Sequence, residues 1–163
     1  MSLFASRFFT ASLLLLTAAC AGYAPHKQLI GQPRAAVIAE LGQPEREYPA
    51  QELSKLHYPR GSAGLHTYFV YIDKADQVTH WEQVLTEERF DRLRPGMTLE
   101  QVIDTIGIAR IRNQLAGDRG YVWYYRYQNT QCRSFVIEFT REDVVRSAGY
   151  ILRSGRKCNY VGP

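Results

Sequence analysis

Two segments of the chain share one pattern of glycines and aliphatic residues, 65 positions apart. Residues 31–42 read GQPRAAVIAELG, and residues 96–107 read GMTLEQVIDTIG. Both glycines, the Val-Ile pair and the aliphatic residue before the second glycine coincide. After a two-residue insertion the spacing becomes 67, which aligns residues 68–72 with residues 135–139. Repetition at a fixed spacing indicates that one supersecondary unit occurs twice, so we expect a tandem-repeat fold.

Each copy begins with the signals of a helical pair. In the second copy, Thr98 and Gln101 match a capping box, in which two side chains satisfy free N–H groups at the start of a helix. Apolar residues follow at helical spacing as far as Gly107, a residue type that commonly ends helices. A short helix is expected just before, over residues 87–93, with Thr86 as its N-cap. These signals predict a helix-turn-helix pair.

Aromatic-rich segments with strand propensity follow the helices in each copy, separated by polar turns. A sheet with one face covered by two helices is a stable two-layer arrangement. We therefore expect an α+β fold of two tandem units, each a helix-turn-helix pair packed on an antiparallel sheet of three or four strands. The expected strands are residues 56–58, 66–72 and 77–84 in the first copy and residues 121–127, 134–140 and 144–151 in the second.

The first 19 residues have the composition of an export signal. Arg7 is the only charged residue before Lys27, and an apolar run leads through small residues to Cys20. The run is too short to cross a bilayer, which takes about 20 residues. Residues 16–20, LTAAC, resemble a bacterial lipobox, which implies acyl chains on Cys20 as a membrane anchor. The alternative is ordinary secretory cleavage after Ala21.

Two cysteines remain when Cys20 is set aside, namely Cys132 and Cys158. An even number of cysteines in an exported protein favours a disulfide between them. The bond would close a loop whose chain entropy is worth roughly 3 kcal/mol of stability. Two unpaired, buried thiols are the alternative.

The helical motif and the following aromatic strand resemble the BamE (SmpA/OmlA) family of outer-membrane lipoproteins and, more broadly, the β-lactamase-inhibitory-protein fold. Position 109 is Ala where the family has Pro, and Gln32-Pro33 replaces Met-Thr in the first copy. The matching residues are Gly96, Met97, Thr98, Val102, Ile106, Gly107, Trp123, Tyr124 and Tyr125.

The resemblance also implies how the chain is divided and where it resides. We expect a lipoprotein signal peptide over residues 1–19, a lipid-anchored linker over 20–28, a first BamE-like repeat over 29–93 and a second over 94–163. In lipoproteins of this kind, an Asp directly after the lipidated cysteine resembles an inner-membrane retention signal. Here that residue is Ala21. The resemblance therefore implies the periplasmic face of the outer membrane.

No sequence pattern indicates an active site. The four histidines, His26, His57, His66 and His80, lack the spacing of metal ligands, and no nucleophile elbow or phosphate-binding glycine loop occurs. The net charge of +4 is spread along the chain without a basic run, which argues against nucleic-acid binding. We therefore expect a protein that is not an enzyme and that has no cofactor, no metal and no small-molecule substrate.

The aromatic strands are the candidates for binding another protein. Alternation along residues 121–127 places Trp123 and Tyr125 on one face and Tyr124 and Arg126 on the other. One face is expected to pack under the helices and the other to be an exposed surface of the composition enriched at interfaces. Core packing is the alternative for each ring. The candidate protein-binding residues are Tyr58, Phe69, Tyr71, Trp81, Trp123, Tyr124, Tyr125 and Arg126.

These expectations lead to two functional hypotheses. The first is a lipid-anchored periplasmic binding or scaffold protein whose partner is an envelope protein. The family resemblance implies the β-barrel assembly machinery of the outer membrane as that partner. The alternative is a protein inhibitor that caps a periplasmic or secreted enzyme with the aromatic face of its sheet.

Overall fold

The computed structural model describes residues 23–153 of the chain. Cys20, Cys158 and the expected signal peptide lie outside the described residues, so the export signal, the lipid anchor and the disulfide to Cys132 stay predictions. Within the described residues the fold is α+β with two antiparallel sheets, as the sequence predicts. No helix between residues 23 and 153 has both the length and the apolar character needed to cross a membrane.

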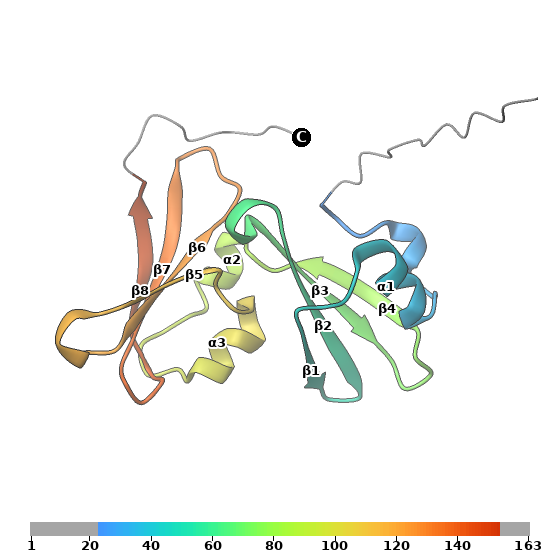
Figure 1. The fold of residues 1–163 in the computed structure, drawn as a ribbon, viewed down its shortest axis with the longest axis horizontal. Helices are drawn as coiled ribbons and strands as arrows, with labels where there is room; N and C mark the ends of the chain where they lie inside the picture. Colours follow the sequence, from blue (N-terminus) through green and yellow to red (C-terminus); the bar gives the residue numbers. More distant parts are fainter. Residues whose placement is uncertain (1–22, 154–163) are drawn as a thin grey trace, which may run out of the picture.

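Each half of the chain contributes short helices followed by four strands (Figure 1). The first half contains η1 (Lys27–Leu29), α1 (Arg34–Leu41), β1 (Arg46–Ala50), β2 (Leu53–Arg60), β3 (His66–Ile72) and β4 (Val78–Gln83). The second half contains α2 (Glu87–Phe90), α3 (Leu99–Ile106), β5 (Ile111–Gln114), β6 (Tyr121–Arg126), β7 (Arg133–Phe139) and β8 (Val145–Leu152). Two further 3-10 turns, η2 (Ser62–Gly64) and η3 (Ala116–Asp118), lie in loops.

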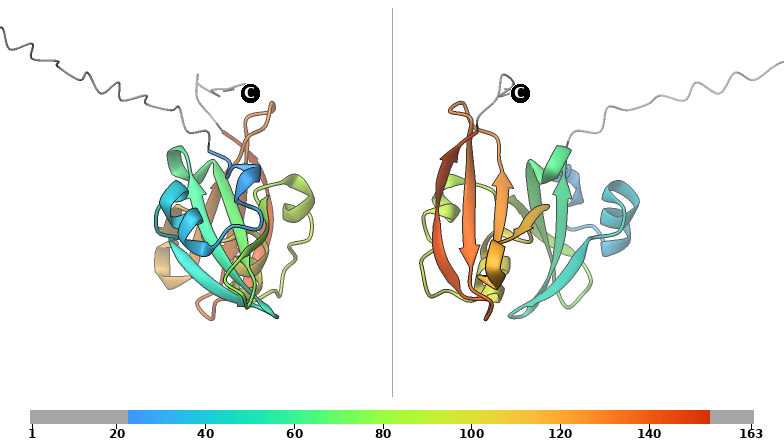
Figure 2. Two further views of the ribbon diagram at one scale, coloured as in Figure 1. Left: turned by 90° about the vertical axis from the view of Figure 1, so that its right-hand side faces the viewer. Right: turned by 60° about the vertical axis from the view of Figure 1, so that its left-hand side comes forward.

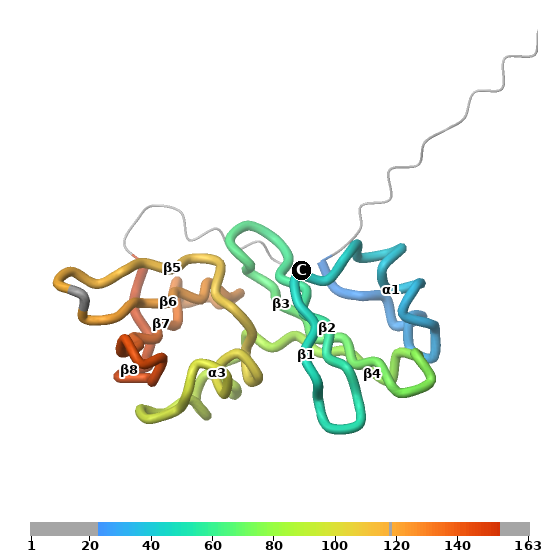
Figure 3. The backbone as a smooth tube through the Cα atoms, turned by 60° about the horizontal axis from the view of Figure 1, so that its bottom comes forward, coloured from blue at the N-terminus to red at the C-terminus, as the bar shows by residue number. Residues whose placement is uncertain are grey.

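The strands of each half pair in chain order, β1-β2-β3-β4 in sheet 1 and β5-β6-β7-β8 in sheet 2. Figure 1 shows four successive layers: sheet 2, the α2–α3 layer, sheet 1, and the α1–η1 layer. In Figure 3 as well, α3 lies between sheet 2 and the β1–β2 hairpin. The α2–α3 layer is therefore sandwiched between two sheets.

Local sequence signals account for the helix boundaries. At the start of α3, the hydroxyl of Thr98 accepts the N–H of Gln101 at 3.3 Å, and the Thr98 N–H donates to the Gln101 side chain at 2.8 Å. This is the capping box that the sequence predicts. Thr86 caps α2 by accepting from the N–H of Arg89. However, α2 ends at Phe90, earlier than the expected residue 93.

The same backbone contacts join the helices to the last strand in both halves. The N–H of Gly31 donates to the Val78 carbonyl at 2.8 Å, and the N–H of Gly96 donates to the Val145 carbonyl at 2.8 Å. Isolated β-bridges also link Pro33 with Gln77 and Thr98 with Val144. The two halves thus share one element order and one way of closing each sheet against its helices.

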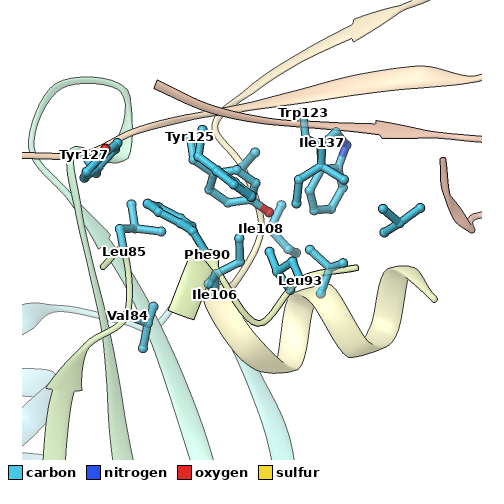
Figure 4. Packing of buried hydrophobic residues seen from close by; sticks show 14 of the residues in the cluster. Val84, Leu85, Phe90, Leu93, Ile106, Ile108, Trp123, Tyr125, Tyr127 and Ile137 are labelled. Atoms are coloured by element: carbon cyan, nitrogen blue, oxygen red, sulfur yellow. The ribbon is translucent and has the colours of Figure 1, made fainter. Parts of the chain in front are cut away.

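Two hydrophobic cores lie between these layers. The first packs α1 and η1 against sheet 1. The second packs α2 and α3 against sheet 2, and it also takes in Phe69 from β3 together with Val84 and Leu85, which follow β4. Figure 4 shows Val84 and Leu85 on the side of this cluster near Phe90. Because residues of the first half enter the core of the second, the two halves form one packed body.

Candidate protein-binding surfaces

Four of the eight candidate aromatic and arginine side chains are core residues. Tyr58, Phe69, Trp123 and Tyr125 are all at most 5% exposed. The Tyr125 hydroxyl donates to the Gly107 carbonyl at 2.8 Å and so ties β6 to the end of α3. The expectation that these four side chains form a contact surface is corrected, because both cores are built from the sheet faces that carry them.

The other four candidates, Tyr71, Trp81, Tyr124 and Arg126, are half-buried. Trp81 packs against the first core, with its ring 5.8 Å from that of Tyr68. Tyr71 stacks on His80 at 4.1 Å, and its hydroxyl donates to the Glu82 carboxylate at 2.7 Å. Tyr124 and Arg126 lie on the face of sheet 2 opposite to Trp123 and Tyr125, as strand alternation predicts. Partner binding by these four residues stays a prediction.

The face of sheet 1 that turns away from α1 is buried against the second half. Lys55, on β2, is only 2% exposed. Its ammonium group donates to the Asp104 carbonyl at 2.9 Å, pairs with the Asp104 carboxylate, and lies 4.6 Å from the centre of the Phe69 ring. A buried cation needs such partners, because desolvation would otherwise be unfavourable. Sequence reasoning missed Lys55, because a lysine between apolar strand residues is typical of a solvent-facing position.

His57 occupies the centre of this interface and is fully buried. A Cβ atom added to Gly107 would lie 2.4 Å from the His57 Nε2 atom, so the imidazole fills the space that the glycine leaves open. Neither ring nitrogen has a hydrogen-bond partner among residues 23–153. Burial, reinforced by the positive charges of Arg110, Lys55 and Arg46, lowers the pKa of His57 to about 4. The ring is therefore neutral at pH 7.

Ion pairs at the margin fix the orientation of the two halves. Arg110 donates to the Glu45 carboxylate at 2.7 Å, across 65 positions of sequence. Arg89 donates to the Thr105 carbonyl at 2.8 Å and pairs with Glu82 of β4. These contacts link the residue before β1 to the segment after α3, and β4 to α2.

A groove of about 530 Å³ opens between the β1–β2 hairpin and the α2–α3 layer. Its lining combines apolar hairpin residues with cations that already have acidic partners, namely Lys55 with Asp104 and Arg92 with Glu88. Such a surface is polar without a strong net charge. The groove therefore suits a protein segment better than a small anion. The lining residues are Pro49, Ala50, Gln51, Leu53, Lys55, Tyr71, Arg89, Arg92, Asp104 and Thr105.

The second accessible surface is the outer face of sheet 2, which turns away from α2 and α3. In the right-hand view of Figure 2, neither α2 nor α3 lies in front of it. Strand register places one row of small and apolar residues across this face. The row consists of Ile111, Tyr124, Val136 and Gly149, and beside it lie Ile151 and Val122, the latter only 7% exposed. We call these six residues the outer face.

Among residues 23–153 there is neither a cluster of metal ligands nor a hydrogen-bond partner for the buried histidine. Between residues 23 and 153, no three His, Cys, Asp or Glu side chains gather as metal ligands would. The buried His57 has no neighbouring nucleophile or carboxylate within hydrogen-bonding distance in this range.

The family comparison concerns mainly the second half. Residues 82–149 match the family described as the outer membrane protein assembly factor BamE domain. No curated protein matches the chain.

Three solved structures are similar at low identity. A cysteine-rich secretory protein from Staphylococcus aureus subsp. aureus Mu50 is 11% identical, with a TM-score of 0.28 and coverage of 77% of this chain and 45% of that one. An extracellular SCP-domain protein from Bacillus anthracis str. Ames is 10% identical, with a TM-score of 0.33 and coverage of 93% and 50%. A DUF4309 family protein from Bacillus subtilis subsp. subtilis str. 168 is 13% identical, with a TM-score of 0.30 and coverage of 79% and 86%.

The chain thus spans about half the length of the first two of these structures. The family match runs from the end of β4 through α2 and α3 to β8. Residues 82–149 are therefore similar to the BamE domain of outer-membrane protein assembly factors.

Proposed function

We propose that this chain is a lipid-anchored binding or scaffold protein that assists the assembly of β-barrel proteins at the periplasmic face of the outer membrane. The observation that carries the proposal is the match of residues 82–149 to the BamE domain, whose family is described as an assembly factor. The lipobox-like segment that ends at Cys20 supports the anchor. The packed interfaces and the two accessible surfaces support a role in contact rather than in catalysis.

We also propose that residues 29–93 and 94–163 are two copies of one BamE-like unit. The shared element order and the shared closing hydrogen bonds support this division. Each sheet also has an irregularity between its last two strands, after Tyr71 in sheet 1 and after Glu138 in sheet 2, which is again a spacing of 67. Gly42 and Gly107 end their helices with positive φ angles of 81° and 77°.

The assembly partner, on this proposal, binds in the groove between the two halves. Both halves line the groove, so a tandem protein offers a concave surface that one unit alone would lack. Tyr71 lies in it, and tyrosine is enriched at protein interfaces because its ring is apolar and its hydroxyl tolerates water. Gln51 and Arg92 are exposed at its rim, where a partner would meet them first.

Crosslinked pull-down from detergent-solubilised envelopes tests this function. The wild-type chain should recover components of the β-barrel assembly machinery. The variant Gln51→Arg/Arg92→Glu should recover about tenfold less, which corresponds to about 1.4 kcal/mol. The charge reversal Arg141→Glu, on the exposed β7–β8 turn, is the matched control and should leave recovery unchanged. Recovery of a single soluble enzyme instead would favour the inhibitor hypothesis, and absence of assembly components would contradict the proposal.

A further inference from the structure

Sheet 1 and sheet 2 present equivalent faces, but among residues 23–153 only that of sheet 1 is covered. The strand register aligns one row of sheet 1 with one row of the outer face. His57 and Phe69 in the first row are fully buried under the second half, whereas Tyr124 and Val136 in the second row are half-exposed. The corresponding pairs are Arg46 and Ile111, His57 and Tyr124, Phe69 and Val136, and Glu82 and Gly149.

The ends of the last strands repeat this difference. Val84 and Leu85, which follow β4, are 0% and 4% exposed, because they pack into the core of the second half. Ile151 and Leu152, 67 positions later, are 43% and 76% exposed. Large apolar residues this exposed at one corner of a sheet mark an interaction site. Their counterparts in the first half are covered by a layer of helices.

At the opposite end of the molecule, the α1–η1 layer is a helical layer with an exposed side. In α1, Ala39 is exposed, and it corresponds to Asp104 of α3 at the 65-residue spacing. Gly42 corresponds to Gly107, yet nothing lies within 4 Å of the position that a Cβ on Gly42 would occupy. At Gly107 the imidazole of His57 fills that position. In the described part of the chain, no sheet therefore packs on α1 and Gly42 in the way that sheet 1 packs on α3 and Gly107.

The residues at the two vacant surfaces are complementary pair by pair. Within the chain, Lys55 meets Asp104. The equivalent residues are Val122, which is 7% exposed, and the exposed Ala39, both apolar. His57 meets Gly107 within the chain. The equivalent residues are Tyr124 and Gly42, so Tyr124 of one copy would place a ring over Gly42 of another.

The remaining pair is ionic in both cases. Glu45 meets Arg110 within the chain, and the equivalents of these two residues are Arg110 and Glu45 themselves. The Arg110 side chain is 52% exposed and the Glu45 side chain is 32% exposed, which leaves both accessible to a second ion pair.

From this complementarity we propose that copies of the chain associate head to tail. The outer face of sheet 2 of one copy receives α1 and Gly42 of the next, as sheet 1 receives α3 and Gly107 within each chain. The inference rests on the proposed two-unit repeat. The two contacting surfaces differ, so each added copy leaves one outer face and one α1 surface free. The assembly therefore grows as a row, unless the rotation between neighbouring copies closes it into a ring.

Photo-crosslinking of the full chain in its membrane tests this contact. A photo-reactive phenylalanine in place of Tyr124 should yield a crosslinked dimer on irradiation. Mass spectrometry should place the link within residues 35–45 of the second copy. Ala39→Arg should lower the dimer yield by about tenfold, since an arginine there would lie unpaired against Val122. Glu142→Arg, on the exposed β7–β8 turn and outside α1, is the matched control and should leave the yield unchanged.

A paired substitution makes the test more specific. Ala39→Asp alone should weaken the contact, and Ala39→Asp combined with Val122→Lys should restore it, because the pair would reproduce Lys55 with Asp104. A link to a different protein, a link elsewhere on the second copy, or no dimer would overturn the proposal. Recovery of assembly components with Ala39→Arg reports separately on the proposed function, because α1 does not line the groove.

Discussion

Replacing Gly107 with alanine measures how tightly the two halves pack. Gly42 and Gly107 have nearly the same backbone conformation, so alanine should destabilise both positions by about 1–3 kcal/mol through the positive φ alone. At Gly42 the new methyl group enters open space. At Gly107 it would lie 2.4 Å from His57 Nε2, inside a fully buried interface. Overpacking of that kind adds about 1–3 kcal/mol.

Urea denaturation of the two variants, followed by tryptophan fluorescence, gives the comparison. We expect Gly107→Ala to unfold with a free energy about 1–3 kcal/mol lower than that of Gly42→Ala. Because the backbone penalty is common to both, the difference reports the contact between His57 and Gly107. Equal destabilisation by the two substitutions would refute the packing of sheet 1 against α3.

Three further predictions concern acid sensitivity, the cysteines and the anchor. The pKa of His57 is about 4 in the folded protein and about 6.5 when unfolded, so as pH falls from 6.5 to 4 the unfolded state gains a proton first. The free energy of unfolding should drop by up to about 3 kcal/mol over this range, and a pH series in urea should show a smaller drop for His57→Leu. Non-reducing gels should show a Cys132–Cys158 disulfide as a mobility shift that Cys158→Ser abolishes. The Arg153 N–H donates to the Cys132 carbonyl at 3.0 Å, so Arg153 lies beside Cys132. Cys20→Ala should move the protein from the membrane to the soluble fraction. Retention of this variant in the membrane fraction would contradict the anchor.

The sequence predicts those elements whose signals are local. The capping box at Thr98 and the helix end at Gly107 depend on a few neighbouring residues, and both occur in the structure. The main antiparallel strands follow from runs of aromatic and β-branched residues. β1 and β5 were not predicted, because REYPA contains a proline and IRNQ is largely polar. Both are edge strands, and they form by pairing with β2 and β6.

The binding surfaces were harder to predict, because burial depends on how the halves pack. Residues 55–58, KLHY, alternate polar and apolar side chains as a half-exposed strand would. In the structure all four are buried, since the α2–α3 layer covers the second face of sheet 1. The repeat is the sequence feature that could have predicted this burial. If the helices of the second copy cover the sheet of the first, Lys55 and His57 become buried.

Depletion of the chain from its host tests the central claim most directly. In cells lacking the protein, folded outer-membrane barrels can be counted by the mobility difference between heated and unheated samples on gels. The account predicts that the folded fraction falls, and that the wild-type chain restores it while Gln51→Arg/Arg92→Glu does not. An unchanged folded fraction after depletion would contradict a role in barrel assembly.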